Sequence, residues 1–131
     1  MVNRTTHLWG FSTKLFLDDR IMLTRMWADE GGGASSLHLH ERRHNLFQVS
    51  RGLIVVSMED FRLTVQPGKM RHHYLRPGHA ILVPAGQKHR LTVIEPMEGI
   101  ELYVAAGDEP IDPNDIHRFD EGWRPGDKRE G

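Results

Sequence analysis

The sequence predicts an all-β protein, an antiparallel sandwich or barrel, on three observations. Turn signals built from Gly and Pro recur at short intervals along the 131 residues. The runs between them are short and rich in Val, Ile, Leu, Phe and Tyr, which is the composition of strands. No segment carries a sustained apolar stripe at the helical period, so helices are not expected to build the core.

Each predicted strand lies between two turn signals. In the run Phe61–Val65 the apolar residues occupy every second position, which places them on one face of a strand. Many short strands separated by turns are typical of a sandwich or a barrel. The predicted strands are Phe11–Leu17, Arg20–Ala28, Leu46–Ser50, Leu53–Met58, Phe61–Val65, Ala80–Val83, Leu91–Ile94 and Ile100–Ala105.

The last 25 residues differ in composition from the rest of the chain. Twelve of residues 107–131 are charged. The Asp112-Pro113 pair resembles a helix start, because an N-cap acceptor precedes a proline in the first turn. A single domain, residues 1–131, is predicted, with its core in about 7–106. The C-terminal extension is expected to hold one short helical turn and to fray after about residue 124.

Charge and composition exclude several classes of partner and site. Lys and Arg number 17 against 18 Asp and Glu, so a net charge of −1 offers no basic field for nucleic acid or an anionic membrane. Cysteine is absent, which excludes disulfides, thiolate metal sites and a thiol nucleophile. The sequence has neither a long apolar span nor an apolar signal segment, and a cytoplasmic protein is expected.

Nine histidines are the unusual feature of the composition, and three of them are spaced as metal ligands. His38 and His40 are two residues apart, so on a strand both imidazoles project from one face. His89 follows the tight turn 84–88, which fixes its direction. Such a set leaves coordination positions open for water or substrate. A His-x-His pair alone, however, is also common on a solvated strand face.

The other histidines are predicted at the surface or at sheet edges, with His44 left open. Adjacent residues on a strand face opposite sides, so His72 and His73 cannot both line one cavity. His44 is next to Asn45 and points to the other side of the strand unless a bulge turns it. The remaining surface histidines are His7, His79 and His117.

Two stretches around the three spaced histidines resemble the two motifs of the cupin superfamily. The spacing of the first motif is kept by Gly32, His38, His40, Asn45 and Gly52. The spacing and residues of the second are kept by Gly78, Pro84, Gly86 and His89. The resemblance implies a double-stranded β-helix, or jelly-roll barrel, with a metal site inside its mouth.

Within that superfamily the sequence resembles the type II mannose-6-phosphate isomerases over about residues 7–120. The resemblance implies a divalent metal ion (Zn²⁺, Ni²⁺, Fe²⁺ or Mn²⁺) and isomerisation of a sugar phosphate through a metal-stabilised enediol. It rests on four further segments, which are Leu8-Trp9-Gly10, Ser36-Leu37, His89-Arg90-Leu91 and Asp115–Asp120.

Asn45 departs from the first cupin motif, which has Glu at this position. That carboxylate usually completes the ligand set, whereas a carboxamide is neutral and offers a metal only a weak oxygen ligand. The predicted metal ligands are therefore His38, His40 and His89, with Asn45 as a weak or lost fourth. The sequence leaves open whether the site has kept its metal.

A sugar phosphate needs a cationic clamp and a general base. Arg90 and Arg118 match the motifs of the isomerase family, and Lys88 lies near the predicted mouth. A guanidinium can hold a phosphate through two parallel hydrogen bonds. Glu41 and Glu101 are the candidates for the base, and the sequence gives no geometry with which to choose between them.

Two other functions stay open from the sequence alone. One is a non-catalytic cupin that binds a sugar or another small molecule, which Asn45 and the short chain favour. The other is a metal-dependent cupin dioxygenase, made less expected by the neutral ligand set. A homodimer is also predicted, because exchange of strands around Phe11–Leu17 would cover exposed sheet edges.

Overall fold

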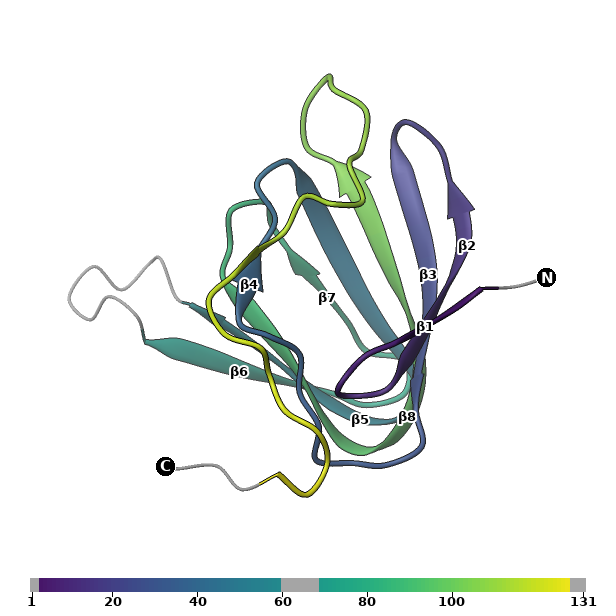
Figure 1. The fold of residues 1–131 in the computed structure, drawn as a ribbon, viewed down its shortest axis with the longest axis vertical. Coiled ribbons are helices and arrows are strands. Elements are labelled where there is room, and N and C mark those ends of the chain that lie inside the picture. The colour runs from purple at the N-terminus through teal and green to yellow at the C-terminus, as the bar shows by residue number, and fades with distance from the viewer. Residues whose placement is uncertain (1–2, 60–68, 128–131) are drawn as a thin grey trace.

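The chain folds into a strongly curled antiparallel β-sheet that encloses its own core (Figure 1). The computed structural model describes residues 3–59 and 69–127. These residues form no helix, so none is present that could cross a membrane, and the all-β prediction is confirmed. The strands are β1 (Arg4–Thr6), β2 (Phe11–Leu17), β3 (Ile21–Ala28), β4 (His38–Leu39), β5 (Arg43–Glu59), β6 (Met70–Leu75), β7 (Ala80–Val83), β8 (His89–Ala105) and β9 (His117–Arg118).

The long strands β5 and β8 pair with each other along most of their length and belong to both halves of the sheet. In one half, residues 43–49 of β5 and 99–105 of β8 are flanked by β7 and β3, with β2 and β1 beyond β3. In the other, residues 53–58 of β5 and 89–95 of β8 are flanked by β6 and β4, with β9 beyond β4. We call them the β3 half and the β4 half.

The two halves fold over each other because β5 and β8 bend together. The register of β5 against β8 shifts between Val49 and Ile54. Gly52 lies in this bend with φ of +87°, in the left-handed region that favours glycine. A Cβ at this position would lie 2.0 Å from the carbonyl oxygen of Pro96 on β8. The bend therefore depends on a residue without a side chain.

The space between the halves is apolar near the bend and polar at the opposite end. Along β5 the buried inward residues change from Arg43 and Asn45 at the far end to Val49 beside the bend. Along β8 they change from His89 to Val93 in the same way. The apolar cluster closes the barrel at the bend, and the polar residues gather at the mouth.

The predicted strands match the structure closely where turns separate them. Phe11–Leu17 and Ala80–Val83 have the predicted bounds. The two runs predicted within β5 form one strand, since Gly52 bends the backbone without ending its pairing with β8. The two runs predicted within β8 are likewise continuous. The predicted strand Phe61–Val65 lies outside the described residues.

The short helical turn predicted near Asp112 does not form. A single turn closes instead, in which the Asp115 N–H donates to the Asp112 carbonyl at 3.1 Å. The Asp112 carboxylate accepts the Asn114 N–H at 2.9 Å, a local bond that competes with helix formation. We call residues 111–127 the C-terminal strap, the yellow-green to yellow segment that runs beside β4 in Figure 1 and pairs with it through β9. The strap continues past residue 124 in a further turn, and residues 128–131 lie outside the description.

Replacing Gly52 with alanine should strongly destabilise the fold, because it adds a left-handed alanine and a clash with the Pro96 carbonyl. We expect a loss of about 3 kcal/mol or more in the free energy of unfolding, measured by urea denaturation. Gly78→Ala is the matched control, since its φ is +89° but its Cβ would meet nothing within 4 Å. The control should lose only about 1 kcal/mol, and equal losses would contradict the role given to the bend.

Candidate metal centre

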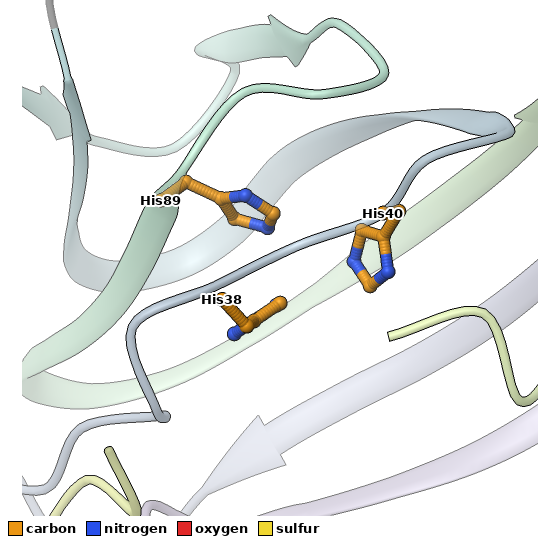
Figure 2. A group of neighbouring side chains, drawn as sticks. All are labelled: His38, His40 and His89. Carbon is orange, nitrogen blue, oxygen red and sulfur yellow. The ribbon is translucent and has the colours of Figure 1, made fainter. Parts of the chain in front are cut away.

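Three histidines of the β4 half meet at the mouth of the barrel, two of them on strands and His40 directly after β4. His38 begins β4, and its Cα is paired in register with that of His89, the first residue of β8. His40 follows two residues after His38 and turns to the same side. Figure 2 shows the three rings gathered around one space. Their ligand atoms lie within 4.8 Å of one another, so the sequence-predicted trio is brought together.

The ring nitrogens of the three histidines have defined roles. Each Nδ1 lies close to a backbone carbonyl oxygen, at 2.7 Å from Ser36 for His38, 2.7 Å from Asp115 for His40 and 2.9 Å from Gln87 for His89. A carbonyl only accepts, so each Nδ1 carries the proton and donates it. Each Nε2 is then left with a free lone pair, the form in which imidazole binds a metal.

The free nitrogens fit a divalent ion. His40 Nε2 and His89 Nε2 are buried and have no hydrogen-bond partner within the described residues. A buried acceptor without a partner is unfavourable, and a cation on these lone pairs would compensate for it. Three imidazoles with ligand atoms within 4.8 Å of one another are a donor set suited to Zn²⁺, Ni²⁺, Fe²⁺ or Mn²⁺.

All three imidazoles are held neutral. Burial lowers the pKa of His38 to about 3, with further lowering by the neighbouring His89 and His40. Burial and the Arg43 guanidinium lower the pKa of His40 to about 3. Burial also lowers the pKa of His89 to about 4. At neutral pH no proton competes with a metal for these nitrogens.

Asn45 faces the same space from the opposite half of the sheet. Its neighbours on the inner face of the β3 half contact the cluster, with ring centroids 6.1 Å apart for Phe47 and His89 and 5.4 Å apart for Tyr103 and His40. The Asn45 Nδ2 donates to Glu101 Oε2 at 2.8 Å. Its Oδ1 is buried, has no hydrogen-bond partner in residues 3–59 and 69–127, and is left available to a cation.

His44 lies outside the cluster, as the strand alternation predicts. Its Nδ1 accepts the N–H of Ala85 at 2.9 Å, on the other side of β5 from Asn45. The group of metal-ligating side chains found in the described residues consists of His38, His40 and His89. His44 is therefore a structural residue that fastens the turn preceding His89.

Glu101 is joined to this centre through Asn45, whose Nδ2 donates to the Glu101 carboxylate. Burial raises its pKa, while hydrogen bonds from Tyr103 and Asn45 and the charge of Arg43 oppose the rise. Burial likewise raises the pKa of Tyr103, with Glu101 beside it as a second cause. Arg43 is itself buried, with its guanidinium 4.0 Å from the centre of the Tyr103 ring. The four residues form a polar wall on the β3 half.

Three residues of the wall, Arg43, Glu101 and Tyr103, line a common cavity of about 600 Å³. His38 and His40 line the same cavity. Arg118, from β9, lines the same cavity and forms no ion pair with a described residue. Lys14 and Arg124 add positive charge near the rim, with Glu121 as an acidic neighbour. The cavity thus has a carboxylic acid and imidazoles inside and an excess of cations toward solvent.

Three residues with predicted functional roles lie apart from the cavity. Glu41 is exposed, with its carboxylate 3.2 Å from His117 Nε2. Lys88 is 3.8 Å from the Glu59 carboxylate and lies over the Phe119 ring. Neither residue is among those that line the cavity.

Arg90, the third, is engaged by the C-terminal strap. It forms an ion pair with Asp120, and its guanidinium lies 4.6 Å from the centre of the Trp123 ring. It does not line the cavity. The structure thus gives Arg90 a role in holding the strap, and Arg118 is the predicted clamp residue at the cavity.

Sequence reasoning did not assign Tyr103 and underestimated Arg43. The sequence places Arg43 near the predicted mouth, either as a clamp residue or as a solvated charge at the rim, and it gives Tyr103 no role. Arg43 is two positions from Asn45 on β5, and Tyr103 is two positions from Glu101 on β8. Both therefore lie on the inner face of the sheet, with residues that the sequence did single out. The period of two along each strand was therefore the signal that could have found them.

Solved structures identify the class of this fold. Neither family models nor curated proteins match the sequence. Oxalate decarboxylase from Bacillus subtilis superposes on 90% of the chain with a TM-score of 0.72 at 14% identity. The capsular polysaccharide assembling protein CapF from Staphylococcus aureus superposes on 90% with a TM-score of 0.68 at 16% identity. The fold is a cupin β-barrel, and the chain spans 30% and 31% of the lengths of these two proteins.

Metal binding should depend on the three histidines and respond to Asn45. The protein should bind one Mn²⁺ or Zn²⁺ by calorimetry, and His89→Ala should abolish binding because it removes one of three ligands. Asn45→Asp should tighten binding roughly ten-fold or more by adding a negative charge. The same variant should be less stable without metal, since its carboxylate would face Glu101. His44→Ala, the histidine control, should bind normally, and loss of binding there would contradict this assignment.

The metal-free protein should lose stability as the pH falls from 6 to 4.5. The three histidines have native pKa values of about 3 to 4, below the value near 6.5 of an unfolded chain. The unfolded state therefore binds more protons in this window, and each histidine lowers the free energy of unfolding by about 1.4 kcal/mol per pH unit. Urea denaturation with a chelator would measure the slope. His38→Asn should reduce the slope by the contribution of one histidine, about 1.4 kcal/mol per pH unit. An unchanged slope would contradict the conclusion that His38 is neutral in the folded protein.

Proposed function

We propose that the protein is a metal-dependent isomerase of a small sugar phosphate. One observation carries the proposal, namely that Glu101 lines the same cavity as His38 and His40, two of the three clustered imidazoles. Aldose–ketose isomerisation needs a base and an electrophile at adjacent carbons of one substrate. The resemblance of the histidine motifs and of residues 115–120 to type II mannose-6-phosphate isomerases supports the same reaction class.

The three Nε2 atoms would hold the metal, and Asn45 Oδ1 is the available neutral oxygen beside them. A bound divalent ion would polarise the carbonyl and hydroxyl oxygens of the substrate and so acidify the intervening C–H. Oxalate decarboxylase, one of the structural neighbours, has Mn(II) centres. That supports Mn²⁺ as the first ion to test, with Zn²⁺, Ni²⁺ and Fe²⁺ as the alternatives.

Glu101 is the general base of this proposal. Its carboxyl is fixed by hydrogen bonds from Asn45 and Tyr103, and its raised pKa suits a group that both accepts and returns a proton. In the aldose-to-ketose direction it takes the proton from C2 and returns it to C1. The hydroxyl proton on O2 is transferred to O1, so substrate and product are isomers.

Arg118 is the residue proposed to bind the phosphate. Its side chain is exposed on the cavity wall, so a phosphate dianion could pair with it while the sugar carbons reach the imidazoles. Lys14 and Arg124 extend the positive rim around it. The buried guanidinium of Arg43 donates from Nη1 to the Asp112 carbonyl at 3.1 Å, and its Nε has no partner among the described residues. It adds positive charge to the cavity beside Glu101.

A second candidate function is non-catalytic binding of a sugar or another small molecule. Asn45 is the observation that favours it, because three neutral imidazoles and an amide provide no anionic ligand to the metal. A cupin dioxygenase has less support for the same reason. Saturable binding of hexose phosphates without product would favour the binding protein over the isomerase.

Glu101→Gln should lower turnover of a hexose phosphate by about 10²-fold or more while metal binding is retained, because only the base is lost. Exchange of the C2 proton with deuterated solvent, followed by NMR, reports the same step directly. Arg118→Ala should instead raise KM with little change in kcat.

The matched carboxylate control is Glu95→Gln, an exposed residue of β8 outside the cavity. It should leave turnover unchanged. Wild-type protein that carries metal and leaves every hexose phosphate unchanged would overturn the isomerase proposal.

A further inference from the structure

The strap is fastened to the segment that carries two of the three candidate ligands. Residues 37–42 contain His38 and His40, and they are flanked on both sides by carboxylates of the strap. Asp120 Oδ1 accepts the Leu37 N–H at 2.9 Å on the side before His38. Between the flanks, β4 pairs with β9 in an antiparallel register.

Asp115 binds the other side of this segment with both of its carboxylate oxygens. Its Oδ1 accepts the Glu41 N–H at 3.0 Å, and its Oδ2 accepts the Arg42 N–H at 2.8 Å. Both donors follow His40 directly in sequence. Two charge-assisted bonds to neighbouring amides fix the position of the Asp115 backbone relative to His40.

The same residue contacts the imidazole itself. The Asp115 carbonyl accepts the His40 Nδ1 proton at 2.7 Å, although the two residues are 75 positions apart in sequence. The corresponding carbonyls for His38 and His89 come from two residues earlier in each case, Ser36 and Gln87. His40 is thus the one of the three whose ring is set by a distant segment.

The Arg43 guanidinium competes with the Asp115 carbonyl for His40 Nδ1, so the contact with Asp115 decides which tautomer His40 adopts. The Arg43 Nη2 lies 3.2 Å from the same His40 Nδ1, and a guanidinium can only donate. If the Asp115 carbonyl moved away, Arg43 would stabilise the tautomer with its lone pair on Nδ1 and its proton on Nε2. That tautomer cannot offer Nε2 to a metal.

We propose that Asp115 is a positioning residue of the metal centre, and that the strap sets the His40 ring for metal binding by holding its Nδ1 proton. The carboxylate locks the strap onto residues 41–42, and the carbonyl selects the tautomer. The C-terminal strap is in this way a functional part of the site. The inference rests on the proposed function only in that His40 is taken as a metal ligand.

Two readouts on the full-length protein test the proposal. The first is the dissociation constant for Mn²⁺ alone, which Asp115→Ala should raise about ten-fold or more. The second is the His40 tautomer in the metal-free protein, from the nitrogen-15 shifts of its ring. The wild type should carry its proton on Nδ1, and Asp115→Ala should move it toward Nε2.

The conservative variant and a control complete the test. Asp115→Asn keeps one acceptor oxygen and should lie between wild type and alanine in both readouts. Asp127→Ala removes a strap carboxylate that accepts the Arg124 N–H at 2.9 Å, away from residues 37–42, and it should leave both readouts unchanged.

A lower melting temperature for Asp115→Ala with unchanged Mn²⁺ affinity and tautomer would overturn the proposal and leave the strap a structural role. If the wild type binds no divalent ion, the proposed function fails. The tautomer readout then still decides whether Asp115 sets the His40 ring. If Asp115→Ala does not fold, Asp115→Asn gives the answer on the same two measurements.

Discussion

The joint bend of β5 and β8 is the constraint on which the rest of the structure depends. Each strand contributes one part to each half of the sheet, so the bend brings two inner faces into opposition. His89 belongs to the β4 half, whereas Asn45 and Glu101 belong to the β3 half. No local motif could place an imidazole cluster opposite a carboxylic acid in this way. The glycine at the bend is therefore as much a determinant of the site as the ligands are.

Much of the fold and part of the site could be predicted from the sequence because their signals are local. His38 and His40 are two residues apart in an extended segment, and His89 follows a turn. Their spacing along the chain therefore predicts the directions in which their side chains project. Asn45 was recognisable as a departure because the motif fixes what is expected there. The continuity of β5 through Gly52 was not predictable from the sequence. Many strands end at a glycine with positive φ, whereas other strands bend at such a glycine and continue.

The rest of the site depends on pairs far apart in sequence. The choice between Glu41 and Glu101 required knowing that strand β8 lies beside β5, which places Glu101 within 2.8 Å of the Asn45 amide. Arg90 matched a motif, yet its partner Asp120 lies 30 residues away and draws it to the strap. The helical turn near Asp112 was predicted from capping residues alone. Its carboxylate and carbonyl instead form bonds that suit an extended strap crossing the mouth.

The substitution of an amide at position 45 changes how charge is distributed around the imidazoles. With a carboxylate ligand, negative charge would contact the cation directly. Here the carboxylate is Glu101, one hydrogen bond further away, and burial raises its pKa against the opposing charge of Arg43. A divalent ion on the imidazoles would act in the opposite direction and favour the ionised carboxylate, because opposite charges attract strongly in a poorly solvated site. If the imidazoles bind a metal, its charge and the protonation of Glu101 would be linked through Asn45. The amide that makes the ligand set neutral would then also connect the metal to the proposed base.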